Sequence, residues 1–209
     1  PAEWKKYRAF DYGLDMFACL WIAVDYDGRA YVYREVQQSG LIVSEAARLA
    51  LDLTPAWEHI ECTIAPPDMW NRQKDSGKSM AELFAENGLG LLRASNNRIQ
   101  GWMALKEMLK PMLDENDKPG LLVTEDCRCL IENLPAIQHD EKNPSDCATE
   151  PHDITHCVDA IRYFAVTRTL GAERVEVPEE PEFEDAAVDY DEEMTGGDMT
   201  DDYLAYGGG

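Results

Sequence analysis

The strand pattern of the first 36 residues is the feature that most constrains the fold. Residues 18–25 (Ala-Cys-Leu-Trp-Ile-Ala-Val-Asp) are dense in β-forming side chains, and residues 30–36 alternate apolar and polar side chains. Asp27-Gly28 between them is a typical signal for a tight hairpin turn. A further strand is expected at residues 6–11, so the chain is predicted to begin as a three-stranded meander.

After this meander, short strands and helices alternate along the chain. Ser44 is expected to cap the first helix, and Gly88 is expected to end the second. The predicted helices are 44–53, 79–87, 100–113, 128–134 and 154–169, and the predicted short strands are 60–65, 89–94 and 121–124. This order predicts an α/β fold in which a mixed sheet is flanked by helices.

Composition divides the chain into a folded part, residues 1–170, and an acidic tail, residues 171–209. The chain has 209 residues and a net charge of −22, and the tail holds 14 acidic residues against one arginine. Because the tail has few large apolar side chains, we expect it to be disordered. Two more specific hypotheses for the role of the tail are that it contacts another protein and that it imitates DNA.

Targeting signals and disulfide bonds are not expected. No apolar run approaches the roughly 18 residues that a membrane span needs, and the charged start of the chain is unlike a signal peptide. The six cysteines are scattered, and Cys127-Arg128-Cys129 is one residue too tight for the paired spacing of a zinc site. We therefore expect a soluble protein with reduced, structural cysteines.

Three carboxylates stand where the chain direction could bring them together. Asp11 ends the first strand, Asp68 follows residues 60–65 beyond a Pro-Pro break, and Asp159 lies on the final helix. If the first and fourth strands are neighbours, these side chains share one cleft edge. Hard oxygen ligands of this kind suit Mg²⁺ or Mn²⁺. An acid at a strand end is usually a solvated cap, so spacing alone leaves this site open.

Four segments occur in an order that resembles a known family. They are Arg8-Ala-Phe-Asp11-Tyr-Gly13, Ala65-Pro-Pro-Asp68-Met-Trp, Asn97-Arg98-Ile-Gln-Gly101-Trp102 and His156-Cys-Val-Asp159-Ala-Ile-Arg162-Tyr163. Together they resemble the C-terminal nuclease domain of tailed-bacteriophage terminase large subunits. The resemblance covers roughly residues 5–168.

The resemblance implies a ribonuclease H-like fold and a metal-dependent endonuclease. Such an enzyme cleaves concatemeric viral duplex DNA during genome packaging into procapsids. By position, the resemblance assigns two Mg²⁺ or Mn²⁺ ions to Asp11, Asp68 and Asp159, with His156 as a further catalytic residue. The family often has an acid where this chain has Thr155. The role of His156 is therefore open: it orients a water, binds metal or flanks the site.

The same resemblance implies partners and a place of action. The partners would be double-stranded DNA, the portal protein, the terminase small subunit and the ATPase domain of the full-length large subunit. No membrane is involved, and the place is the host cytoplasm. We do not expect the ATPase domain in this sequence, because it contains no phosphate loop. Residues 75–79 (Asp-Ser-Gly-Lys-Ser) are the nearest candidate, but Arg72 stands where that motif needs a glycine.

Basic side chains offer candidate contacts to DNA. Residues 1–170 are acidic overall, so DNA binding has to come from a local basic patch. Arg72, Lys74 and Lys78 cluster in a loop a few residues after Asp68 and are candidates for phosphate contacts, as is Arg98. A solvated basic loop is almost as compatible with the sequence.

Three alternatives stay open at this stage. His152, His156 and Asp159 lie at i, i+4 and i+7 of the final helix, which resembles a zinc-ligand arrangement, although no HExxH motif is present. A resolvase-type nuclease has the same fold, but it typically needs a fourth acid and a more basic surface. A non-catalytic module that docks on the portal would carry these acids without using them.

Overall fold

The computed structural model describes residues 1–209 except 14, 75–76, 113–116 and 174–209. A six-stranded mixed sheet forms its centre, in the order β5-β4-β1-β2-β3-β6. The strands are β1 (Lys5–Tyr12), β2 (Met16–Val24), β3 (Ala30–Ser39), β4 (Cys62–Ala65), β5 (Leu92–Arg93) and β6 (Leu121–Val123). β2 pairs antiparallel with both β1 and β3. The other three pairs are parallel: β1 with β4, β4 with β5, and β3 with β6.

The predicted meander is confirmed, and its turn has a clear local cause. Gly28 has a φ of 87°, a conformation that a side chain would strain. The Asp25 carboxylate accepts hydrogen bonds from the backbone N–H of Asp27 and of Arg29, at 3.0 and 2.8 Å. These bonds hold the turn that returns the chain from β2 into β3.

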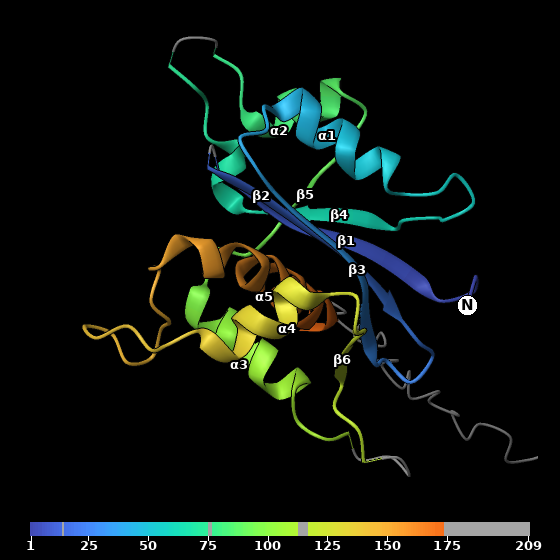
Figure 1. The fold of residues 1–209 in the computed structure, drawn as a ribbon, viewed down its shortest axis with the longest axis vertical. Helices are drawn as coiled ribbons and strands as arrows, with labels where there is room; N and C mark the ends of the chain where they lie inside the picture. Colours follow the sequence, from blue (N-terminus) through green and yellow to red (C-terminus); the bar gives the residue numbers. More distant parts are fainter. Residues whose placement is uncertain (14, 75–76, 113–116, 174–209) are drawn as a thin grey trace, which may run out of the picture. The chain divides into compact units, whose positions relative to one another are not determined.

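Helices cover both faces of the sheet (Figure 1). α1 (Val43–Asp52) and α2 (Met80–Glu86) lie on one face, and α3 (Arg98–Met108), α4 (Arg128–Asn133) and α5 (His152–Glu173) lie on the other. Two short 3₁₀ helices, η1 (Pro67–Trp70) and η2 (Leu134–Ala136), complete the described elements. None of the described helices is long and apolar enough to cross a membrane.

Successive side chains of β1 point alternately to the two faces of the sheet. Phe10 is buried with Phe17 and Phe84 on the α1–α2 side, whereas Ala9 is buried with α5 residues such as Ile161. Because successive side chains of a strand point to opposite faces, Asp11 shares the face of Ala9. The carboxylate is thus directed toward α5.

Several element boundaries differ from those predicted. α1 begins at Val43 because the Glu45 carboxylate accepts a hydrogen bond from the backbone N–H of Ile42 (3.1 Å), so Ser44 lies inside the helix and does not cap it. β5 is only two residues long, because the Leu89 backbone N–H bonds the Phe84 carbonyl (3.0 Å) at the end of α2.

The remaining helices also differ at their ends. α3 begins at Arg98, where the Asn97 side chain accepts from the Gln100 N–H (3.0 Å), and ends at Met108, before the predicted residue 113. α5 begins at His152 and continues to Glu173, past the predicted end at 169. The acidic tail predicted for residues 171–209 lies outside the described residues from residue 174 onward. All six cysteines are free thiols, as expected.

Candidate functional site

The parallel pairing of β1 and β4 brings two of the predicted acids to one edge of the sheet. Tyr7 is opposite Cys62 and Ala9 is opposite Ile64, so both strands end at the same edge. Asp11 is the penultimate residue of β1, and Asp68 lies in η1, directly beyond β4. The first and fourth strands are therefore neighbours, as the predicted grouping of Asp11 and Asp68 requires.

His156 joins α5 to this edge. Its Nδ1 lies 2.7 Å from Asp11 Oδ2, and its Nε2 lies 3.3 Å from Asp15 Oδ2 in the loop between β1 and β2. The imidazole is buried, with 6% of its side chain exposed. Gly13 lies close to this contact: a Cβ there would be 2.5 Å from Asp15 Oδ1, so Asp15 would have to shift, and 3.6 Å from His156 Cε1, an ordinary contact distance.

The pKa of Asp11 depends on its burial, on His156 and on the charges of the other two predicted acids. Burial raises the pKa of the Asp11 carboxyl, and the charges of Asp159 and Asp68 raise it further, against the lowering effect of the His156 hydrogen bond. The pKa of His156 is raised, chiefly by its hydrogen bond to Asp11 and against the effect of burial. The cluster therefore concentrates negative charge in a partly desolvated place.

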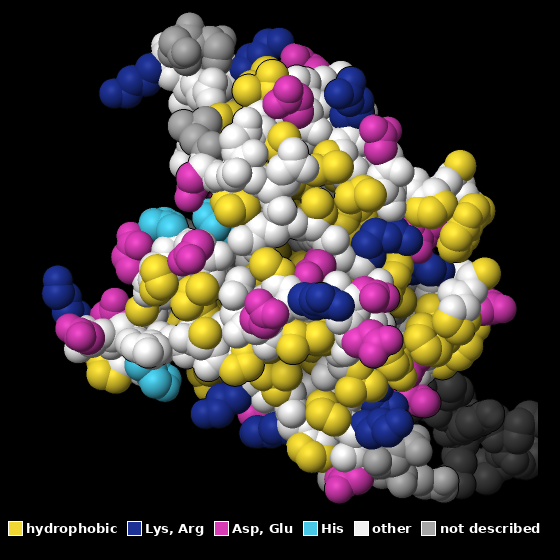
Figure 2. All heavy atoms as spheres, viewed as in Figure 1, with side chains coloured by type: hydrophobic (Ala, Val, Ile, Leu, Met, Phe, Trp, Pro, Cys, Tyr) yellow, Lys and Arg dark blue, Asp and Glu magenta, His cyan; other side chains and the backbone are white. Residues whose placement is uncertain are grey.

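The donor set fits divalent cations. Asp11, Asp68 and Asp159 offer only carboxylate oxygens, which are the hard ligands preferred by Mg²⁺ and Mn²⁺. The repulsion that raises the pKa of Asp11 is relieved when a cation lies among the carboxylates. Figure 2 shows histidine and acidic side chains adjoining at the left of the molecule in this view.

Asp159 is held from the opposite side by two arginines. Its Oδ1 accepts from Arg162 Nε at 2.7 Å and lies 3.5 Å from the Arg98 guanidinium. Arg98 also donates to Asp146 (3.1 Å), whose Oδ1 accepts from Trp102 Nε1 at 2.7 Å. Arg162 and Asp159 thus form an ion pair within α5. Asp146 and Trp102 were not predicted as members of this network.

Arg162 occupies a narrow space between α3 and α5. Its side chain is 1% exposed, and its guanidinium carbon lies 4.3 Å from the Tyr163 ring centroid and 5.2 Å from that of Trp102. A Cβ at Gly101 would lie 2.8 Å from Arg162 Cγ. The glycine in α3 therefore leaves the volume through which this arginine reaches Asp159.

The predicted DNA-contacting residues fall into two places. Arg72, Lys74 and Lys78 are exposed in the loop between η1 and α2, although Lys78 forms an ion pair with Glu86 at 2.6 Å. Arg98 is apart from this loop and is bound to Asp146 and Asp159. Arg98 therefore already has two anionic partners within the protein, Asp146 and Asp159, in the absence of DNA.

Among the described residues, the alternative ligand set of His152, His156 and Asp159 does not form one group. The two histidines do lie together at the start of α5, but the carboxylate beside them belongs to Asp15. Asp159 points instead to the arginines on the α3 side, because Arg162 Nε holds it at 2.7 Å. Asp15 was not predicted, and its only sequence signal is an acid close behind Gly13 in a strand-connecting loop.

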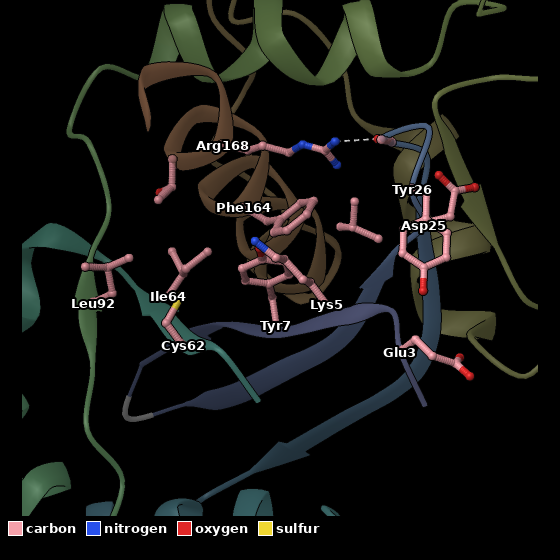
Figure 3. A pocket seen from close by; sticks show the side chains of 13 residues that line it. Glu3, Lys5, Tyr7, Asp25, Tyr26, Cys62, Ile64, Leu92, Phe164 and Arg168 are labelled. Carbon is pink, nitrogen blue, oxygen red and sulfur yellow. Dashed lines mark hydrogen bonds between the residues drawn. The ribbon is translucent and has the colours of Figure 1, made fainter. Parts of the chain in front are cut away.

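A separate cavity of about 660 Å³ lies at the opposite end of β1 and α5 (Figure 3). Tyr7, Ile64 and Phe164 form its apolar lining, and Arg168 reaches along it to the Gly28 carbonyl. None of the predicted site residues lines it. The cavity is therefore separate from the residues for which the sequence predicts chemistry.

The fold matches the nuclease domains of three phage large terminases. That of the phage P22 large terminase aligns with a TM-score of 0.62 and 19% identity, covering 81% of this chain and 84% of that chain. The domain from bacteriophage SPP1, crystallised with bound Mn, gives 0.53 and 18%, over 79% and 86%. The domain from thermophilic phage G20c gives 0.54 and 13%, over 81% and 83%. These matches confirm the ribonuclease H-like mixed sheet.

No family model matches the sequence, and no curated protein matches it.

Proposed function

We propose that this chain is a divalent-metal-dependent endonuclease that cuts concatemeric viral duplex DNA during genome packaging. The observation that supports the proposal is that β1 and β4 pair in parallel and end at one edge of the sheet with Asp11 and Asp68, where His156 of α5 bonds Asp11 at 2.7 Å. The shared fold supports it, because one of the matching terminase nuclease domains was crystallised with bound Mn. Function depends on the site rather than on the fold, so the acids are the part to test.

Asp11, Asp68 and Asp159 are the proposed metal ligands. Two Mg²⁺ or Mn²⁺ ions bound there would activate the attacking water and stabilise the leaving oxygen of the phosphodiester. The protein's own contribution is to hold the carboxylates in place before DNA arrives. His156 fixes Asp11 through its Nδ1 (2.7 Å), and Arg162 fixes Asp159 through its Nε (2.7 Å).

Arg98 has a proposed role between protein and DNA. Its guanidinium is 29% exposed and lies beside two carboxylates, Asp146 and Asp159. A DNA phosphate that reaches this edge offers Arg98 an alternative anionic partner. The arginine would then neutralise the phosphate, while Arg162 keeps Asp159 oriented.

The proposed partners follow from this activity. Duplex DNA is the substrate, and the portal protein, the terminase small subunit and an ATPase domain in the full-length protein are the proposed assembly partners. The host cytoplasm is the proposed place of cutting. The contact with another protein that is hypothesised for the acidic tail falls on residues outside those described, from residue 174 onward.

Plasmid nicking tests the activity directly. Supercoiled plasmid is expected to be nicked and linearised by the purified chain with Mn²⁺ or Mg²⁺, and to stay intact when EDTA is in excess. The reaction is followed by gel electrophoresis at a fixed salt concentration. Cleavage that continues at the same rate in excess EDTA would contradict the two-metal assignment.

The loop of Arg72, Lys74 and Lys78 is expected to bind DNA phosphates. Replacing all three residues by alanine should flatten the slope of log K against log salt by about 0.9 for each lost contact. The slope is measured by fluorescence anisotropy with a labelled duplex, in Ca²⁺ or EDTA to prevent cleavage.

A matched control for this loop lies in the last turn of α3 and in the segment that follows it. Lys106, Lys110 and Lys118 are exposed, and Lys110 forms an ion pair with Glu107 as Lys78 does with Glu86. Their triple alanine variant removes the same charge and should leave the slope almost unchanged. If both triple variants flatten the slope equally, only the net charge matters and the loop has no specific role.

A further inference from the structure

A second set of metal-ligating side chains adjoins the proposed nuclease site. Asp15, His152 and His156 each place one ligand atom within 4.8 Å of the others. His152 and His156 are one helical turn apart at the start of α5, with ring centroids separated by 5.9 Å. Asp15 comes from the loop between β1 and β2. Residues from two distant parts of the chain thus meet at one point.

The hydrogen bond between His156 and Asp11 prepares His156 for coordination. A carboxylate can only accept, so Asp11 Oδ2 holds a proton on His156 Nδ1, 2.7 Å away. Nε2 lies 3.3 Å from Asp15 Oδ2 and donates to it when no metal is bound, so an ion that binds between these two atoms would displace the Nε2 proton. Metal-bound histidines usually show this arrangement, in which a carboxylate orients the ring from its other nitrogen.

The chemistry of this set differs from that of the three aspartates. Two imidazoles and one carboxylate suit Zn²⁺ and related transition metals, whereas an all-carboxylate set suits Mg²⁺ and Mn²⁺. The His152 and Asp15 side chains are 60% and 63% exposed, so an ion can enter from solvent and keep a water ligand. Glu150 Oε1, 3.2 Å from His152 Nε2, is a further carboxylate at the rim.

We propose that Asp15, His152 and His156 form a transition-metal site, typically for Zn²⁺, whose occupation inhibits the nuclease. The bound ion would coordinate His156 Nε2 and Asp15, so His156 would no longer be free to act in cleavage. It would also add positive charge next to Asp11 and weaken binding of the catalytic ions. The inhibitory half of this proposal depends on the proposed nuclease function, whereas the binding half does not.

Binding is tested on the metal-free chain with Zn²⁺ alone, by titration calorimetry. One Zn²⁺ per chain is expected, and His152→Ala should weaken its affinity at least tenfold, because it removes one of three ligands. His59→Ala removes an exposed histidine elsewhere on the surface and should change nothing. Equal affinity of the parent and His152→Ala proteins would overturn the site.

Co²⁺ identifies the ligands, because the chain also carries six free thiols. The visible spectrum of the Co²⁺ protein is expected to show nitrogen and oxygen ligation without a thiolate charge-transfer band. The spectrum should be lost in His152→Ala and retained in His59→Ala. A thiolate band that survives in His152→Ala would place the bound ion on cysteines and overturn the proposal.

The inhibitory half is measured by plasmid nicking with Mn²⁺ fixed and Zn²⁺ increasing. His152→Ala should keep the parental rate without Zn²⁺ and need at least tenfold more Zn²⁺ for half inhibition. Equal inhibition of both proteins would place the inhibitory ion among the aspartates and overturn this half. If the parent protein does not nick DNA, the nuclease proposal fails, and the calorimetry still decides the binding half.

Discussion

Asp11→Asn is expected to lower the rate of Mn²⁺-dependent cleavage by about three orders of magnitude. Bound metal ions supply several kcal/mol of transition-state stabilisation, and about 1.4 kcal/mol corresponds to a factor of ten in rate. The substitution keeps the size of the side chain, and the amide oxygen of the introduced asparagine could still accept from His156 Nδ1. The loss would therefore be one of charge at the metal ligand and not of fold.

The same variant should be more stable than the parent protein at neutral pH when metal is absent. The pKa of Asp11 is raised in the folded protein, above all by burial. A folded carboxyl with a raised pKa binds more protons than the unfolded chain does, so its contribution to stability is lost as pH rises through the folded pKa. The uncharged amide avoids this loss, so the gain in Tm should be absent near pH 3 and present at pH 7.

Asp68→Asn separates the two effects. Asp68 is exposed, so its neutralisation should remove activity to a similar degree without a comparable gain in Tm. Asp126→Asn, at an exposed position before α4, is the control and should change neither quantity. An Asp11→Asn protein that cleaves at the parental rate would rule out Asp11 as a metal ligand. A lowered Tm at pH 7 would show that the His156 ion pair outweighs the cost of burial.

The sequence predicted the acids better than it predicted their surroundings. Asp11 and Asp68 follow strands that form by local preference, and the parallel pairing of those strands is enough to bring the two ends to one edge. Asp146 could not be predicted, because it lies in a polar segment without periodicity and meets Arg98 across 48 positions of sequence. Contacts of this range depend on how helices pack and not on local pattern.

The zinc alternative shows the same limit. Helical spacing correctly placed His152 and His156 on one face, since residues four apart are neighbours on a helix. It could not show that Asp159, three residues after His156, is directed to Arg162 and Arg98. Nor could it show that the loop after β1 delivers Asp15 to the same two rings. Helical spacing therefore predicted the grouping of two of the three proposed ligands.

The predicted start of the first helix and the predicted length of the strand at residues 89–94 were both wrong. Ser44 is a good capping residue, but Glu45 bonds the Ile42 N–H and starts α1 earlier. Leu89 looks like the start of a strand, yet it is buried against Phe84 at the end of α2, which leaves β5 two residues long. In the first case a competing local cap sets the helix start, and in the second packing against Phe84 overrides the local strand preference.

Gly101→Ala is expected to destabilise the protein by about 1–3 kcal/mol, the usual cost of overpacking a well-packed interior. Alanine would normally favour a helix interior by up to about 1 kcal/mol over glycine. Here the new Cβ would lie 2.8 Å from Arg162 Cγ. The arginine cannot move aside cheaply, because it is 1% exposed and bonded to Asp159 at 2.7 Å. The clash should therefore outweigh the helix preference, and displacement of Arg162 should also weaken Mn²⁺ binding.

A double-mutant cycle identifies the cause. In an Arg162→Ala background the clash is gone, so Gly101→Ala should then be neutral or stabilising, with a coupling of about 0.5–3 kcal/mol between the two positions. Gly90→Ala is the control, since no heavy atom lies within 4 Å of a Cβ at Gly90, and it should leave both urea stability and Mn²⁺ affinity unchanged. Additive effects of Gly101→Ala and Arg162→Ala would show that the glycine is not there to admit the arginine. Loss of stability with unchanged Mn²⁺ affinity would show that Arg162 supports the fold without positioning Asp159.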